Sequence, residues 1–236
     1  SRLAKPVVAQ LTKFGRTRRG WLGVRIQMVT SEIADSFGLK ETTGALVAEV
    51  SENGPAKQSG IKAGDIILMF NNQKVETMRR LPRIVAETPI GIDVPVILWR
   101  AGKKNKVMVK IGELKEDLVA SKKVSKNNQK KKENKIVKID NLGLALSSLN
   151  AKLKKKFSID DKIKGVVVVG LVPDGVSAGK GVRMGDVIVE VDQGPVNKPS
   201  EVIAVVDKIL KKGAKKSVLF TINRQGSIRF IGLKLN

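Results

Sequence analysis

The sequence predicts an α+β protein built from a duplicated domain, with a lysine-rich linker between the two copies. The first observation is a repeat, because residues 60–67 recur as residues 181–188 at a shift of 121 positions. The second is that short β-branched segments alternate with short helix-forming segments in each copy. The third is the segment 115–140, which is rich in lysine and poor in apolar residues.

The repeat extends beyond its best-matched block. Each block carries a glycine, a β-branched residue, a base and a spacer, followed by Gly-Asp and two β-branched residues. The same shift relates 44–47 to 165–168, and 22–24 recurs as 142–144 at a shift of 120. Chance does not preserve such spacing, so we predict a duplicated domain of roughly 95 residues.

The first copy contains signals for both helices and strands. Gly60 is expected to follow a short helix as its C′ residue, and Gly64-Asp65 fits a tight turn because glycine permits positive φ. Pro82 is tolerated only in a first helical turn, so the helix that contains it should begin near Arg80. Helices are predicted at 32–37, 55–59 and 81–87, and strands at 23–28, 46–50, 66–70, 94–100 and 106–111.

The second copy repeats this plan. Its clearest helix is predicted at 200–210, where Val202, Val205, Val206 and Ile209 recur at helical spacing. A closing hairpin is predicted from strands 218–224 and 227–235, turning at Gln225-Gly226.

The segment 115–140 holds nine Lys and four acidic residues, a net charge of +5 (9 − 4). It has too little apolar surface to offset the entropy of ordering, so a flexible linker is predicted. A nucleic-acid-binding arm is the alternative.

The composition excludes several kinds of catalytic and metal site. The chain has no His and no Cys, so it has no Ser-His-Asp triad, no Cys-His pair and no zinc site built from these residues. A Ser-Lys dyad remains possible by composition, but no Ser lies on a recognisable nucleophile turn. We expect no cofactor, no metal and no catalytic residue in this chain.

The net charge is +23, from 45 Lys and Arg and 22 Asp and Glu. One interpretation is a surface that binds nucleic acid or an anionic membrane, and the other is a solvated lysine-rich surface. Aromatic residues, which stack on bases, make up only 3% of the chain. This favours the solvated surface, and no nucleic-acid partner is expected.

The residues around the first shared glycine carry a specific resemblance. Trp21-Leu22-Gly23-Val24 resembles the carboxylate-binding loop of PDZ domains, and the second copy has Asn141-Leu142-Gly143-Leu144. The block at 60–67 resembles the Gly-Ile/Leu-x-x-Gly-Asp run that PDZ domains carry after a short helix. The resemblance implies two PDZ-like domains, each a small, partly open β-barrel or sandwich capped by helices.

The segment before the first loop extends the resemblance. Residues 18–24, preceded by 4–11 and Phe14-Gly15, resemble the junction in the HtrA/DegP (protease Do) family, where a terminal helix of a trypsin-like protease domain leads into the first of two PDZ domains. Nothing in the chain resembles the Gly-Asn-Ser-Gly-Gly nucleophile loop of that protease domain. The sequence begins with Ser1 rather than Met, so we expect a piece of a longer protein. The implied division is a helix remnant at 1–17, a first PDZ domain at 18–114, a basic linker at 115–139 and a second PDZ domain at 140–236.

A free carboxylate needs several N–H donors that converge on one point, and a glycine in the loop lets the backbone approach it closely. The rest of the peptide is expected to add as a strand beside the segment after the loop. The predicted first site comprises Arg19, Trp21, Leu22, Gly23, Val24, Ile26, Met78, Leu81 and Val85. The predicted second site comprises Leu142, Gly143, Leu144, Leu146, Val202 and Val206.

The resemblance implies the peptide-binding regulatory region of a periplasmic HtrA/DegP-type serine protease. The expected partners are unfolded or cleaved polypeptides with hydrophobic C-termini, captured for protein quality control, and an upstream protease domain through which the protein forms a homo-oligomer. The alternatives are a stand-alone tandem PDZ adaptor and an electropositive binder of nucleic acid or anionic membrane.

Overall fold

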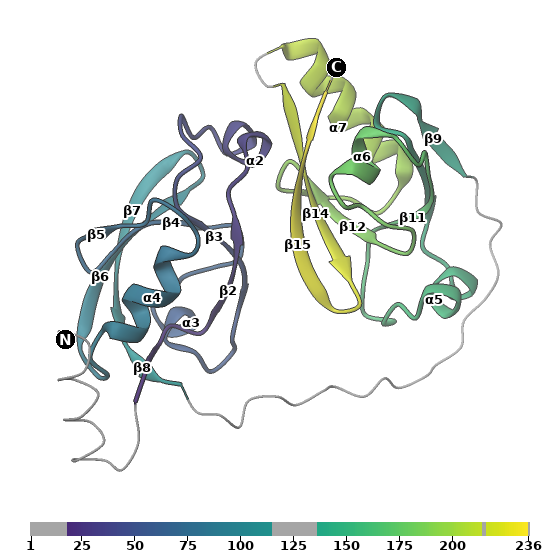
Figure 1. Cartoon of the computed structure of the whole chain (residues 1–236). Coiled ribbons are helices and arrows are strands. Elements are labelled where there is room, and N and C mark those ends of the chain that lie inside the picture. Colours follow the sequence, from purple (N-terminus) through teal and green to yellow (C-terminus); the bar gives the residue numbers. More distant parts are fainter. Residues whose placement is uncertain (1–17, 115–135, 214–215, 236) are drawn as a thin grey trace. The chain divides into compact units, whose positions relative to one another are not determined.

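The computed structural model describes residues 18–114, 136–213 and 216–235, and these fall into two compact units (Figure 1). The described residues of the first unit are 18–28 and 43–114, and all others belong to the second. The predicted helix remnant at 1–17 and most of the predicted linker lie outside the described residues. The predicted domain boundaries therefore remain predictions.

The first unit is built on one antiparallel sheet with the strand order β2-β3-β4-β6-β7. A short pair outside this sheet joins β1 (Gly20–Trp21) to β8 (Gly112–Glu113). Two helices accompany the sheet, α3 (Pro55–Gln58) and α4 (Arg80–Glu87). The strands are β2 (Val24–Met28), β3 (Ala45–Val50), β4 (Ile66–Phe70), β5 (Gln73–Lys74), which pairs with β4, β6 (Asp93–Arg100) and β7 (Lys103–Lys110).

The helix α4 is amphipathic, and this fixes which of its faces meets the sheet. Leu81, Ile84 and Val85 are buried at helical spacing, whereas Arg83 and Glu87 form an exposed ion pair one turn apart. The buried face joins an apolar core, mostly aliphatic, that also contains Phe70 from β4. The helix begins at Arg80, as Pro82 predicted, because the proline then lies in the first turn.

The second unit contains an antiparallel sheet with one strand more than that of the first, in the order β15-β14-β12-β11-β10-β9 with β13 paired to β12. The helices are α2 (Ser31–Ser36), α5 (Ala151–Phe157), α6 (Val176–Gly179), α7 (Pro199–Lys212) and the 3-10 turn η1 (Asp140–Leu142). None of the helices in the described part of the chain is both long and apolar enough to cross a bilayer. The strands are β9 (Val137–Ile139), β10 (Leu144–Ser148), β11 (Val166–Leu171), β12 (Val187–Val191), β13 (Gly194–Pro195), which pairs with β12, β14 (Ser217–Arg224) and β15 (Ser227–Lys234).

Mixed α and β structure with antiparallel sheets is confirmed, and every predicted strand and helix that falls on described residues is present. The second unit has the helix α5 where the plan copied from the first repeat implies one, and it also has β9, η1 and β13, which were not predicted. The helix α5 begins where the Asn150 side chain accepts a hydrogen bond from the Leu153 N–H at 2.7 Å, which is a standard N-cap. The strand β9 occupies residues 137–139, which the sequence had assigned to the linker.

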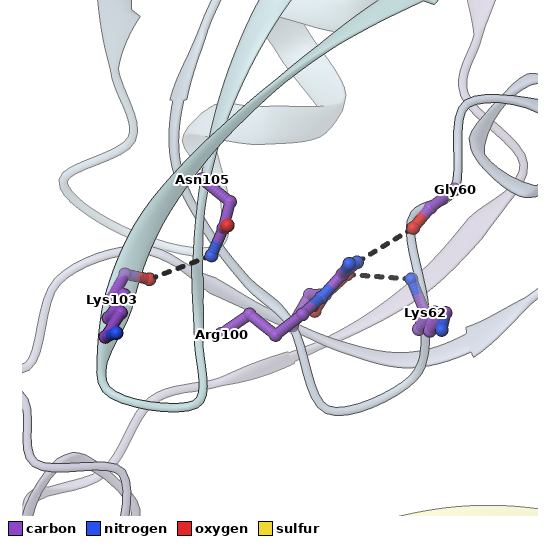
Figure 2. A network of polar contacts seen from close by, with 6 residues as sticks. Gly60, Lys62, Arg100, Lys103 and Asn105 are labelled. Carbon is purple, nitrogen blue, oxygen red and sulfur yellow. Dashed lines mark hydrogen bonds and ion pairs between the residues drawn. The ribbon is translucent and has the colours of Figure 1, made fainter.

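A buried carboxylate joins the Gly-Asp turn of the first unit to the end of β6 (Figure 2). This carboxylate belongs to Asp65, which is 1% exposed, and its Oδ2 accepts from the Lys62 N–H at 2.7 Å. Arg100 donates from Nε to Asp65 Oδ1 at 2.6 Å and from its terminal nitrogen to the Gly60 carbonyl at 2.8 Å. The Asp65 carboxylate raises the pKa of Arg100 above its ordinary value, because it accepts hydrogen bonds from the charged guanidinium.

The second unit repeats this arrangement with different residues. Asp186 accepts from the Arg183 N–H at 2.8 Å and from Arg224 Nε at 2.6 Å, and Arg224 also donates to the Gly181 carbonyl at 2.7 Å. The local backbone bond of each aspartate is typical of an Asp that follows a turn glycine and stabilises that turn. The arginine partners come from a strand 35 and 38 residues later, and turn chemistry does not reveal them.

Replacing Asp65 with Ala is expected to lower the free energy of unfolding of the first unit by about 2–3 kcal/mol. The change leaves the Lys62 N–H and a partly buried guanidinium without their acceptor. Urea unfolding measures the loss. The control is Asp93→Ala at an exposed position on β6, expected to change stability by less than about 0.5 kcal/mol. Equal effects of the two changes would contradict a structural role for Asp65.

Candidate functional site

A groove of about 340 Å³ lies in the first unit between the loop before β2, β2 itself and α4. Two residues of α4, Leu81 and Val85, line one wall, and they share a helix face. The loop and β2 contribute Arg19, Trp21, Leu22, Gly23, Val24 and Ile26. The structure therefore brings eight of the nine residues predicted for this site around one hollow.

The floor of this groove is the core itself. Leu22, Leu81 and Val85 are at most 6% exposed, and they belong to the buried cluster of the first unit. Val24 and Ile26 are half-buried and pack against the same cluster. An apolar side chain placed in the groove would therefore contact side chains that the fold already holds in place.

One predicted residue lies elsewhere. Met78 is half-buried against the core but is not among the residues that line the groove. It precedes α4, so it does not share the helix face of Leu81 and Val85. Sequence reasoning also missed four residues that do line the groove, namely Gly20, Pro82, Ala86 and Leu114. The helical spacing from Pro82 to Ala86 could have identified those two.

The loop carbonyls are held by neighbouring backbone. The Leu22 carbonyl accepts from the Ala56 N–H at 2.9 Å, and the Gly23 carbonyl accepts from the Ser51 N–H at 2.9 Å. Within the described residues, neither the Leu22 N–H nor the Gly23 N–H donates to a backbone carbonyl. The loop thus has anchored acceptors and two successive available donors, the arrangement that forms an anion-binding nest.

Gly23 adopts a φ of +77°, and a Cβ there would lie 2.9 Å from the Gly54 Cα. Only glycine combines this backbone conformation with so close an approach. The contact presses the loop onto the start of α3, and this fixes the position of the two available N–H groups.

The strand β2 lies at one end of its sheet. Its neighbour there is β3, and no other strand within 18–114 covers its outer edge. An edge strand presents unpaired N–H and C=O groups that an extended peptide can satisfy. The edge faces the same groove as the loop donors and α4.

Arg19 is the only charged residue among the described residues that line the groove. Its neighbour Arg18 donates to Glu113 at 2.6 Å, and this contact raises the pKa of Arg18 above its ordinary value. Arg18 is therefore engaged at the β1–β8 pair, while Arg19 places positive charge at the loop end of an otherwise uncharged groove.

Gly20 lets β1 approach the end of α4. A Cβ on Gly20 would lie 2.2 Å from the Val85 carbonyl oxygen and 2.8 Å from the Thr88 carbonyl oxygen. No other residue type fits without moving β1 or the helix. This contact sets the distance between the loop and α4, and thus the width of the groove.

The second copy differs. The predicted residues Leu142, Leu144, Leu146, Val202 and Val206 are at most 3% exposed and belong to the core cluster of the second unit. Gly143 follows η1 with a φ of +64°, and its N–H donates to the Asp140 carbonyl at 3.0 Å. The structure thus brings these residues together as core, and the edge of β10 carries the strand β9.

No group of three or more His, Cys, Asp or Glu within the described ranges is placed to hold a metal ion. Among the described residues that line it, the groove of the first unit has no carboxylate, and its polar groups are backbone atoms and the side chains of Arg19 and Trp21. Such a lining suits an apolar ligand with an anionic end.

Comparison with known proteins identifies the family. The PDZ domain family model matches residues 20–111. A probable periplasmic serine endoprotease DegP-like of Bartonella henselae is 36% identical over 98% of this chain and 43% of its own length. The chain belongs to the PDZ portion of the HtrA/DegP family.

The DegP-like protein of Brucella suis biovar 1 is also 36% identical, over 100% of this chain and 43% of its own length. This PDZ portion therefore spans less than half the length of these HtrA/DegP relatives. Among solved structures, the HtrA-type protease AlgW with decapeptide is 36% identical over 49% of this chain and 35% of its own, with a TM-score of 0.44.

Replacing Gly20 with Ala in this PDZ portion is expected to destabilise it by about 1–3 kcal/mol, because the new methyl group overlaps the carbonyl oxygens of Val85 and Thr88 at the end of α4. Thermal or urea unfolding measures the change. Gly179→Ala is the control, since a Cβ there meets no atom within 4 Å. If Gly20→Ala were as mild as the control, the close packing of β1 on α4 would be refuted.

Proposed function

We propose that the first unit captures polypeptide C-termini by strand addition and serves as the substrate-binding and regulatory region of an HtrA/DegP-type serine protease. The observation that carries the proposal is the coincidence, in one groove, of two available loop donors, an uncovered strand edge and an apolar wall. A peptide C-terminus is the ligand that uses all three.

The terminal carboxylate lies at the loop in this mechanism. It accepts hydrogen bonds from the Leu22 and Gly23 N–H groups, and the charge of Arg19 favours its approach. No side chain has to move to create these donors, because the loop is already anchored by its carbonyls. Preorganisation of this kind lowers the entropic cost of binding.

The preceding peptide residues extend along β2. Their backbone pairs with the outer edge of that strand, and the last side chain enters the hollow between Ile26, Leu81 and Val85. The backbone bonds are independent of sequence, whereas the apolar hollow selects hydrophobic ends. Unfolded or cleaved polypeptides expose such ends, so they are the proposed partners.

At the level of the whole protein, we propose a role in periplasmic protein quality control, in which captured polypeptides are passed to a protease domain upstream of this PDZ portion. The names of the relatives, periplasmic serine endoproteases, support this proposal. Oligomerisation through that protease domain is part of the same proposal. A tandem adaptor without a protease remains the alternative, and the sequence upstream of Ser1 distinguishes the two.

A labelled peptide with a free, hydrophobic C-terminus is expected to bind with micromolar affinity, and the same peptide amidated at least tenfold more weakly. Ala86→Glu is expected to abolish binding of the free peptide, because Ala86 lines the groove on α4 and a carboxylate there opposes the ligand. Fluorescence anisotropy measures both. The matched control is Ala63→Glu, at an exposed position outside the groove.

Equal affinity for the free and amidated peptides would overturn carboxylate capture. Equal loss of binding in the Ala86 and Ala63 variants would show that charge, rather than the groove, governs the interaction.

Replacing Arg19 with Ala is expected to weaken binding of the free peptide by up to about fivefold, since an exposed ion pair contributes about 0.2–1 kcal/mol. Affinity for the amidated peptide should not change. The difference between the two peptides is measured at low and moderate salt, and it should shrink as salt screens the charge. Arg83→Ala, off the groove on the same helix, is the control. An identical loss for both peptides would contradict a charge effect at Arg19.

A further inference from the structure

The strand that follows the loop has a different environment in the two units. In the first unit the outer edge of β2 is uncovered within the described residues. In the second unit the equivalent strand, β10, is paired with β9 on that edge. The helix α7 packs against β9 as well as β10, so β9 lies where the first unit has its open groove.

The direction and register of β9 match those proposed for a bound peptide. It runs antiparallel to β10, with Ile139 opposite Leu144 beside the loop and Val137 opposite Leu146 farther along. Its C-terminal residue is therefore nearest the loop, as a captured C-terminus would be. Ile139 is 6% exposed and lies in the same buried cluster as Val202 and Val206.

The loop donor is also occupied. The Gly143 N–H donates to the Asp140 carbonyl at 3.0 Å, whereas the equivalent Gly23 N–H has no backbone acceptor within the described residues. The chain continues from β9 through η1 into the loop, so its own backbone supplies the acceptor that a peptide carboxylate would supply in the first unit. In the second unit the strand edge is therefore paired, Ile139 lies in the core, and the Gly143 N–H has an acceptor within the same chain.

Two sequence differences explain why the same loop motif gives two arrangements. Gly20 allows β1 to pack against the end of α4, and at a shift of 120 its counterpart is Asp140, which has no room for that contact. The counterpart of the exposed Arg19 is Ile139, an apolar side chain whose burial stabilises the fold. The segment before the second loop therefore turns back onto β10.

We propose that Val137–Ile139 acts as an intramolecular peptide ligand that closes the groove of the second unit to free polypeptide C-termini. The two units then differ in what they can bind: the first unit captures polypeptide C-termini, and the groove of the second unit is already filled by β9. The pairing of β9 with β10 stands independently of whether the first unit captures peptides, and only the statement about capture rests on the proposed function.

A disulfide between the two strands tests the pairing without any peptide. The chain has no Cys, so Lys138→Cys with Ala145→Cys introduces one pair of thiols at directly opposite positions. Opposite residues in antiparallel strands have a Cα separation that a disulfide spans. Mild oxidation is expected to link this pair almost fully. The control is Lys138→Cys with Ser148→Cys, three residues out of register on β10, which is expected to stay largely reduced.

Closure is tested in the chain that carries Ala86→Glu, whose first groove is blocked. This chain is expected to show at least tenfold weaker binding of the free-carboxylate peptide than the unmodified chain. Amide hydrogen exchange on the unmodified chain is the variant-free measurement, and residues 137–139 are expected to be protected to the same degree as 144–146.

The outcomes separate the two proposals. Failure of the opposite pair to oxidise, or exchange at 137–139 as fast as in an unstructured chain, overturns the intramolecular ligand. If the Ala86→Glu chain still binds the peptide, and forming the 138–145 disulfide removes that binding, the second groove is open and closure by β9 is overturned. If the unmodified chain binds no peptide at all, the proposed function is refuted. Efficient formation of the disulfide would still support β9 as the occupant of the second groove.

Discussion

A close approach of two glycine backbones positions the loop in both units, and the groove depends on it. A Cβ on Gly23 would lie 2.9 Å from the Gly54 Cα, and a Cβ on Gly143 would lie 3.3 Å from the Gly175 Cα. Because neither pair carries a side chain, the loop can rest directly on the turn that starts the short helix. The loop carbonyls then bond to that region, which leaves the loop N–H groups directed elsewhere.

The direction of the chain before the loop decides what those N–H groups meet. In the first unit, β1 packs against the end of α4 and pairs with β8, so no strand among the described residues covers the outer edge of β2. In the second unit, the chain arrives along β10 and fills that edge. One shared loop geometry thus supports an open groove in one unit and a filled sheet in the other, through the residues that precede the motif.

The sequence predicted those features that depend on residues close together in the chain. The repeat, the strands, the helix register around Pro82 and the groove wall at Leu81 and Val85 follow from spacing and from the resemblance to PDZ domains. Met78 was predicted as a groove residue beside Leu81 and Val85, but it precedes α4 and is not among the residues that line the groove. The partnership of Asp65 with Arg100 joins residues 35 positions apart, and no local pattern reveals it.

The second site shows a different limit of sequence reasoning. The motif residues Leu142, Gly143 and Leu144 match the first loop closely, yet they are enclosed by a segment that composition assigned to the linker. A strand of three residues, Val137–Ile139, is too short for alternation to reveal, and its lysine neighbours suggest a solvated chain. Only the pairing partner makes it a strand, and that partner is chosen by tertiary structure.

The measurement that tests this account most directly is a titration of the isotope-labelled chain with a free-carboxylate hydrophobic peptide, followed through the backbone amide resonances of both loops. The account predicts large shifts at the Leu22 and Gly23 amides, smaller shifts along β2, and none at Gly143. Shifts of equal size at Gly23 and Gly143 would contradict the closed second groove, and an unmoved Gly23 amide would contradict carboxylate capture by the first loop.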